Sequence, residues 1–133
     1  MKRIIQLSLF LVIPAMIFSA CKKKTLKHWN VKNMASGTIN ISSSSFRDDA
    51  LNITIDSGNT KTFIVMPDDG DNNKVETNPA TNIKYLIIKN AGGSDCTKDY
   101  KDSTKWIIDV KKTKNSGANY EHNYTFEVTN ADF

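Results

Sequence analysis

Histidine and cysteine are scarce in this chain, which has two of each, and their scarcity limits the chemistry that its side chains can support. Zinc sites use three or four nitrogen or sulfur ligands, but beyond residue 21 only His28, Cys96 and His122 are available, at wide spacing. A Cys96/His122 nucleophile pair would need an orienting third group and an oxyanion hole, and the sequence signals neither. We therefore expect no metal centre, no cofactor and no enzymatic activity.

The acidic residues give no complete metal-binding pattern. Asp69, Asp71 and Asn73 alternate as in an EF-hand loop, but Lys74 stands where that loop needs glycine and Ala80 where it needs glutamate. The EF-hand match fails, although a looser oxygen-rich calcium site in this acidic turn stays open.

A carboxylate pair for glycoside hydrolysis is the remaining catalytic candidate. Glu121 and Glu127 are six residues apart, and on a strand this even separation would place them on the same face. Six residues of strand span about 20 Å, which is well beyond the separation that such a mechanism uses. This pair therefore does not change the expectation of a non-catalytic protein.

The net positive charge comes from the beginning of the chain. Six of the 18 basic residues precede residue 28, which leaves 12 against 14 acidic residues and a net charge of about −2 over residues 28–133. Nucleic-acid binding needs basic residues clustered on the folded domain itself, so we expect no nucleic-acid partner.

The apolar run near the start is too short for a comfortable membrane span. Lys2 and Arg3 precede 15 mostly apolar residues, 4–18, that include Gln6 and Pro14. A membrane-spanning helix needs about 20 apolar residues. A short basic region, an apolar stretch and small residues before a cleavage point are typical of a secretory signal peptide.

The residues that close this leader resemble a known processing site. Phe18-Ser19-Ala20-Cys21 resembles the lipobox of bacterial lipoproteins, with Phe18 where leucine is usual. The resemblance covers residues 1–21. It implies that signal peptidase II removes the signal peptide, residues 1–20, and that Cys21 carries a diacylglyceryl group and commonly a further acyl chain such as palmitate.

The lipid anchor and the lysines behind it define where the protein would lie. Two or three acyl chains on Cys21 would hold it at a membrane, since a single chain binds only marginally. Residues 21–27 then form a basic tether. Lys22–Lys24 either contact anionic headgroups, at about 1 kcal/mol each, or serve as a solvated spacer.

The basic tether leaves two questions of location open. Surface-exported lipoproteins often carry acidic residues after the cysteine, so Lys22–Lys24 favour the bacterial outer membrane facing the periplasm, with the cell surface as the alternative. Positive charge beyond an apolar segment also tends to stay in the cytoplasm. A retained signal-anchor of opposite orientation therefore remains the alternative to cleavage.

Helical periodicity is absent beyond the leader, and an alternation of period two takes its place. Residues 51–56 alternate strictly, and a turn at 57–60 leads into residues 61–66, which predicts a hairpin. Residues 83–88 are apolar on both faces, as in a central, doubly covered strand. The remaining expected strands are 29–32, which is short, 38–42, 106–111 and 124–129. The sequence thus predicts an all-β domain over residues 28–133, an antiparallel sandwich of about seven strands.

Aromatic residues separate an expected core from expected surface contacts. Trp106 and Phe126 belong to strand faces that we expect to be buried, and a buried Trp resembles immunoglobulin-like domains, whose disulfide cysteines are missing here. Tyr100 and Tyr120 instead fall in two of three long polar segments, 67–82, 91–103 and 112–122. Such tyrosines either fold back on the sandwich or bind a protein or glycan. If Cys21 is lipidated, Cys96 has no partner within the chain and is an unpaired thiol, with intermolecular pairing or redox chemistry as the alternatives.

These patterns together predict a small envelope lipoprotein with a non-catalytic binding or structural module. Its partners would be a membrane, through the anchor on Cys21, and an envelope protein or glycan, through the long loops at Tyr100 and Tyr120. The alternative is an inhibitor or immunity-type protein that binds an incoming enzyme. A tight stoichiometric complex would indicate the alternative, and weak multivalent glycan binding would indicate an adhesive module.

Overall fold

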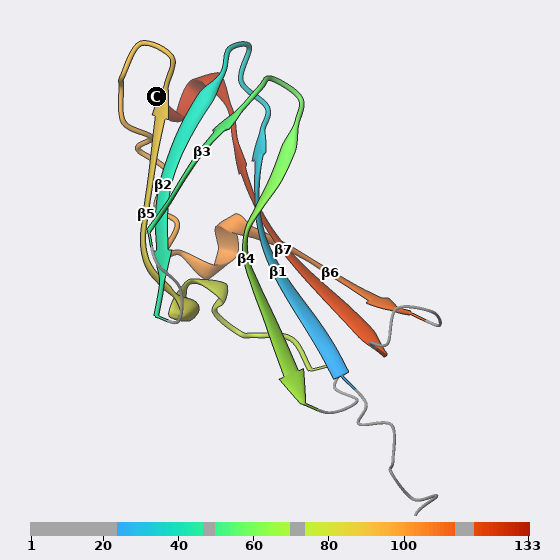
Figure 1. Cartoon of the computed structure of the whole chain (residues 1–133). Coiled ribbons are helices and arrows are strands. Elements are labelled where there is room, and N and C mark those ends of the chain that lie inside the picture. The colour runs from blue at the N-terminus through green and yellow to red at the C-terminus, as the bar shows by residue number, and fades with distance from the viewer. Residues whose placement is uncertain (1–23, 47–49, 70–73, 114–118) are drawn as a thin grey trace, which may run out of the picture.

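The computed structural model describes residues 24–46, 50–69, 74–113 and 119–133 and is all-β, as the alternation of period two predicts. Within these ranges, seven strands are joined by turns and by three short 3-10 helices, and they form two sheets (Figure 1). The strands are β1 (Lys24–Asn33), β2 (Ile39–Ser45), β3 (Leu51–Ile55), β4 (Thr60–Asp69), β5 (Ile83–Asn90), β6 (Trp106–Lys112) and β7 (Tyr120–Val128). The short helices are η2 (Pro79–Asn82), η3 (Ser103–Lys105) and η4 (Asn130–Asp132).

The two sheets have the strand orders β4-β1-β7-β6 and β3-β2-β5. All pairs are antiparallel except β1 with β7, which run parallel. Immunoglobulin constant domains have the orders ABED and CFG, which place the second strand beside the first. Here β2 pairs with β3 and β5, so the likeness to that family extends to the layout of two packed sheets and not to the strand order.

The hydrophobic core lies between the sheets. Trp29, Tyr124 and Phe126 are fully buried in the four-stranded sheet, and Ile39 and Ile41 face them from β2. The expected burial of Trp106 and of the β7 face is confirmed. Figure 1 shows the three-stranded sheet covering the upper part of the four-stranded sheet, whose lower end extends beyond it.

Residues 74–82, here named the strap, cover the inner face of the four-stranded sheet where the other sheet stops. The indole Nε1 of Trp29 donates to the carbonyl oxygen of Pro79 at 2.8 Å, and the backbone N–H of Glu76 donates to the hydroxyl of Tyr124 at 3.0 Å. Pro79 and Ala80 are buried, and Val75 packs on the core. The strap therefore completes the core as a third, irregular layer.

The hairpin expected over residues 51–66 is wrong. Both strands form, but β3 pairs with β2 in one sheet and β4 pairs with β1 in the other. Asn33 holds the connection: its amide Nδ2 donates to the carbonyl of Ile55 at 2.9 Å, and its backbone carbonyl accepts from Gly58 at 2.8 Å. Gly58 has a φ of 78°, which favours glycine. The turn thus joins two layers instead of two neighbours in one sheet.

The central position expected for residues 83–88 is also wrong. The strand β5 lies at the edge of the three-stranded sheet, with β2 as its only strand neighbour among the described elements. Ile83, Leu86 and Ile88 face the core, whereas Ile87 lies on the outer face and is 46% exposed. Apolar residues on both faces of this segment therefore reflect a buried face and an apolar surface, not double coverage.

The folded body begins earlier than the sequence predicts. The first strand starts at Lys24 and runs for ten residues, so residues 24–27 of the expected tether belong to the sheet, and the strand is not short. The expected loops are correspondingly shorter, because β4 extends to Asp69 and β7 starts at Tyr120. Only three residues, 21–23, separate Ala20 from the first strand.

Several sequence-based expectations concern residues outside the described ranges. These are the signal peptide (1–20), the lipid anchor at Cys21, and Asp71 and Asn73 of the acidic turn. Among the described residues, no helix has the length and apolar character that crossing a bilayer requires.

Candidate functional site

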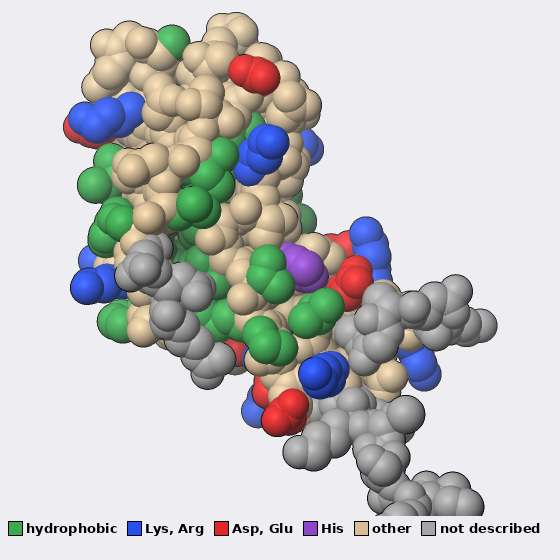
Figure 2. Space-filling view, viewed as in Figure 1, with side chains coloured by type: hydrophobic (Ala, Val, Ile, Leu, Met, Phe, Trp, Pro, Cys, Tyr) green, Lys and Arg blue, Asp and Glu red, His purple; other side chains and the backbone are tan. Residues whose placement is uncertain are grey.

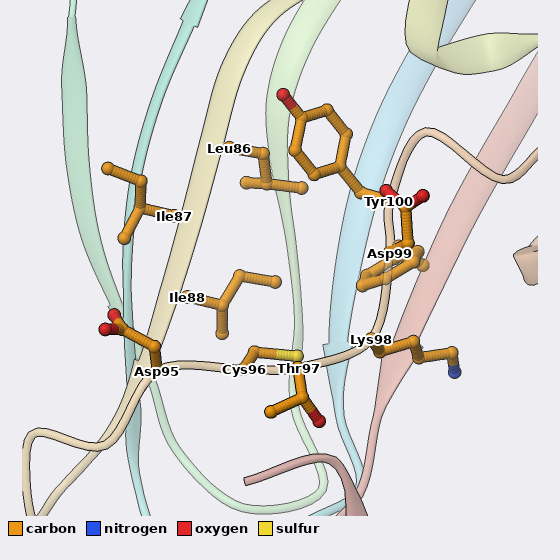
Figure 3. Close-up of a pocket in the computed structure, with 10 residues that line it drawn as sticks. Leu86, Ile87, Ile88, Asp95, Cys96, Thr97, Lys98, Asp99 and Tyr100 are labelled. Carbon is orange, nitrogen blue, oxygen red and sulfur yellow. The ribbon is translucent and has the colours of Figure 1, made fainter.

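A hollow in the described part of the molecule lies beside the free edge of β5. We name it the β5 groove. Its volume is about 510 Å³. Leu86, Ile88 and Phe126 give it an apolar base, and residues 95–100 form the opposite wall (Figure 3). That wall belongs to the connection from β5 to β6, which crosses from one sheet to the other.

The backbone of β5 presents hydrogen-bonding groups to this groove. The carbonyl oxygen of Ile88 accepts from the N–H of Cys96 at 2.8 Å, and the N–H of Asn90 donates to the carbonyl oxygen of Ser94 at 3.0 Å. Both hydrogen bonds lie on the side of β5 that faces away from β2. Because the outward direction alternates along an antiparallel pair, the N–H and C=O groups of Leu86 also point outward, and no described residue bonds to them. At Lys84 a register shift against Ser44 and Ser45 interrupts the alternation. The edge of β5 is therefore closed at one end by residues 94–96 and open at Leu86.

Cys96 and Tyr100 both line the β5 groove, as two of the residues that the sequence marks as notable. Figure 3 shows the Cys96 sulfur, the Leu86 and Ile88 side chains and the Tyr100 ring around one space. Burial raises the pKa of the Cys96 thiol, although Lys98 acts against this shift. The thiol is thus protonated at neutral pH, and a protonated thiol is a poor nucleophile.

The ammonium of Lys98 is held by contacts with β7 and is not a free charge in the groove. Its ammonium donates to the backbone carbonyl of Glu127 at 2.6 Å and lies 5.1 Å from the centre of the Phe126 ring. Asp95 pairs with Lys89 at 3.1 Å. These contacts fasten the connecting segment to β7 and to β5, so the wall of the groove is held in place from both sheets.

A second polar cluster lies under the strap. The ammonium of Lys27 is 2.8 Å from a carboxylate oxygen of Glu76 and 2.9 Å from one of Asp68, and its side chain is only 12% exposed. Burial alone lowers the pKa of Lys27, but the hydrogen bonds and charges of Glu76 and Asp68 outweigh it and raise the pKa. The ion pairs therefore join β1, β4 and the strap.

Tyr124 and His122 extend this cluster into the core. The Tyr124 hydroxyl lies 3.2 Å from Nδ1 of His122, and both residues are fully buried. Burial raises the pKa of the Tyr124 hydroxyl, which the N–H of Glu76 partly offsets. The arrangement has the chemistry of a structural clasp: each polar group has a partner, and the described residues hold no buried side-chain polar atom without one.

Stability at alkaline pH tests this clasp. The folded chain raises the pKa of Cys96, Lys27 and Tyr124 above 9.0, 10.5 and 10.0, so it holds these protons more tightly than the unfolded chain. Stability is then fully present below these values and lost as the pH rises through them. We expect a constant Tm from pH 7 to 9 and a falling Tm above about pH 10 by circular dichroism.

The matched variant is Lys27→Met, which keeps the length of the side chain and removes its charge. We expect it to cost about 1–2 kcal/mol at pH 7, between the values for exposed and buried ion pairs, and to make the alkaline decrease in Tm shallower. An equally steep decrease in wild type and variant would show that Lys27 does not contribute to it.

The structure does not bring the other notable residues into the groove. Tyr120 is the first residue of β7 instead of a loop residue, and it pairs with Thr25 and Lys112 at the far end of the four-stranded sheet. His28 lies on the outer face of that sheet, where Figure 2 shows a histidine among hydrophobic side chains, whereas His122 is on the inner face. Tyr100 and Tyr120 therefore do not form one contact surface.

The acidic residues considered for catalysis or metal binding are also apart. Glu121 and Glu127 lie on β7, and Glu127 pairs with Lys32 at 2.8 Å. Asp68 contacts Lys27 rather than neighbouring carboxylates. Within the described ranges, no three histidine, cysteine or acidic side chains are placed to hold a metal ion.

Two features of the site differ from what the sequence predicts. The sequence places Lys27 in the tether, but Lys27 shares one strand face with Trp29 and Val31, and this alternation is the signal for its place in β1. The outward backbone of β5 had no signal, because an edge position depends on which strands pair and not on residue type.

No family model matches the sequence, and no curated protein matches it significantly, so its function has to be argued from the fold and the β5 groove.

Proposed function

We propose that the protein is a non-catalytic lipoprotein of the bacterial envelope, anchored through Cys21, whose β domain binds an extended segment of another envelope protein along β5. The observation that carries the binding function is the open edge of β5 beside the groove lined by Leu86, Cys96 and Tyr100. The proposal of the anchor depends on the sequence of residues 1–21.

An extended peptide is the ligand that fits an open strand edge. The outward N–H and C=O groups of Leu86 can bond to the backbone of an added strand, and added strands bind in this way at other exposed sheet edges. Natural proteins usually cover or blunt such edges. Here residues 94–96 cover one end of the edge and leave the part beside the groove open.

The groove supplies a place for side chains of the peptide. Successive side chains of an added strand point to opposite faces of the sheet, so alternate ones would enter the groove between Leu86 and Tyr100. Its base is apolar, and the charge of Lys98 is already engaged by Glu127 and Phe126. We therefore expect a preference for a peptide with an aliphatic or aromatic residue at the inward position.

The test is a variant that removes one wall of the groove and leaves the β5 backbone intact. Tyr100→Ala removes the ring that lines the groove, and the Tyr100 carbonyl can still accept the hydrogen bond from the Trp106 indole. Peptides selected from a phage-displayed library against the full-length protein in detergent should bind Tyr100→Ala at least about tenfold more weakly than wild type.

Two control variants show whether the effect belongs to the groove. Lys84→Ala changes an exposed β5 side chain outside the groove, and Thr54→Pro places a proline on β3 at the opposite edge of the same sheet; both should bind like wild type. Selected peptides should also slow alkylation of Cys96 above pH 9, because they would cover its sulfur. Equal peptide binding by Tyr100→Ala and wild type, or binding to a glycan array with no peptide selected, would refute the proposal.

A further inference from the structure

The four-stranded sheet has an unprotected edge at β6. The strand is seven residues long, contains no proline and pairs only with β7 among the described strands. Ile107 is 51% exposed on its outer face and Ile108 is 39% exposed on its inner face. The other edge of this sheet, β4, carries Pro67, whose outward position has no N–H to donate. The two edges of the sheet thus differ in their capacity to pair.

The direction of the backbone groups on β6 follows from the neighbouring strands. The N–H of Met34 donates to the carbonyl oxygen of Val128, so the backbone N–H and C=O groups of the even-numbered residues of β7 point toward β1. The odd-numbered groups of β7 then face odd-numbered residues of β6. Ile108, Val110 and Lys112 therefore direct their N–H and C=O groups to the free edge, where no described residue bonds to them.

We propose that β6 pairs with β6 of a second copy of this chain, antiparallel and centred on Val110, and joins the two four-stranded sheets into one. In this register the two Val110 residues exchange both backbone hydrogen bonds. Ile108 lies opposite Lys112 of the second copy, so the aliphatic stem of the lysine covers an isoleucine that is exposed in the monomer.

The charged residues of β6 favour this register and a second copy of the chain as the partner. Asp109 and Lys111 flank Val110, so each Asp109 lies opposite Lys111 of the second copy, at the closely spaced positions of an antiparallel pair. Centring on Asp109 or Lys111 would place like charges opposite each other. Within one chain the two side chains already attract at 3.2 Å, and both are more than half exposed. The strand is thus complementary to itself.

The experiment separates pairing between copies from the contact within one chain. Asp109→Lys leaves positively charged residues at both positions, and Lys111→Asp leaves negatively charged ones. Each variant alone should dimerise at least about tenfold more weakly than wild type. An equimolar mixture should form a heterodimer as tight as the wild-type dimer, because every cross-strand pair then has opposite charges, while the contact within each chain stays repulsive.

Native mass spectrometry of the full chain in detergent measures these species, since the two variants differ in mass. Wild type should be dimeric at micromolar concentration. Glu127→Lys, a charge reversal on β7 away from the edge, is the matched control and should leave the dimer intact. A monomeric wild type, single variants that dimerise as wild type does, or a mixture without the heterodimer would each overturn the proposal.

Discussion

Replacing Trp29 by alanine is expected to lower the free energy of unfolding by about 3–5 kcal/mol, which is the usual cost of removing a large buried aromatic side chain. Trp29 is fully buried, and its ring centre lies 5.0 Å from that of Tyr124. It also holds the strap, through the hydrogen bond from its Nε1 to Pro79. Small domains are stable by about 5–15 kcal/mol in total, so this one change removes a large fraction.

One further variant isolates the hydrogen bond of the indole, and another is a control. Trp29→Phe keeps most of the packing but leaves the carbonyl of Pro79 without its donor, and a buried group without a partner costs about 1–3 kcal/mol. Ile107→Ala removes an apolar side chain that is half exposed, and we expect a change within about 0.5 kcal/mol. Urea unfolding followed by tryptophan fluorescence and circular dichroism gives all three values.

The strap makes a second prediction from the same variants. If Trp29 fastens the strap, proteolysis within residues 74–82 should be faster in Trp29→Phe than in Ile107→Ala, since the strap would open locally more often. A loss of less than about 1 kcal/mol in Trp29→Ala, or equal proteolysis in the two milder variants, would show that the indole does not organise this layer.

Local alternation was sufficient to predict the strands but not their partners. Residues 51–56 and 61–66 show the same pattern whether they form a hairpin or join two layers, because the period reports only which side chains share a face. What decides between the two is Asn33, more than 20 residues away, whose amide and backbone bind the intervening turn. Contacts of this kind are tertiary and have no local signature.

Only part of the candidate site could be predicted from the sequence. The sequence predicts a contact role for Tyr100 from its polar surroundings, and Tyr100 lines the groove. The sequence predicts no binding role for Cys96, which also lines the groove. The same contact role is predicted for Tyr120, but its backbone belongs to β7. The open groups of Leu86 could not be found from sequence, since an apolar residue in a strand reads alike at an edge and at the centre.

The early start of the fold bears on the lipid anchor. Because β1 begins at Lys24 and Lys27 is held between Asp68 and Glu76, a lipid on Cys21 would be followed by only two residues, Lys22 and Lys23, before the sheet. An extended chain advances about 3.3 Å per residue, so the tether would span roughly 10 Å. The proposed anchor would therefore place the lower end of the four-stranded sheet next to the headgroups, with Lys24 in the first strand.

Cys21→Ala is expected to abolish lipid labelling completely, because the thiol is the proposed site of the first acyl-bearing group. In cells fed labelled palmitate, the wild-type chain should carry label and begin at Cys21, and the variant should carry none and keep residues 1–20. Cys96→Ala, which removes the other cysteine, should be labelled and cleaved as wild type is. Two or more acyl chains bind a membrane far more firmly than one, so wild type should also resist extraction by carbonate. An unlabelled wild type that still contains residues 1–20 would instead indicate a retained signal-anchor, and the lipoprotein proposal would then be abandoned.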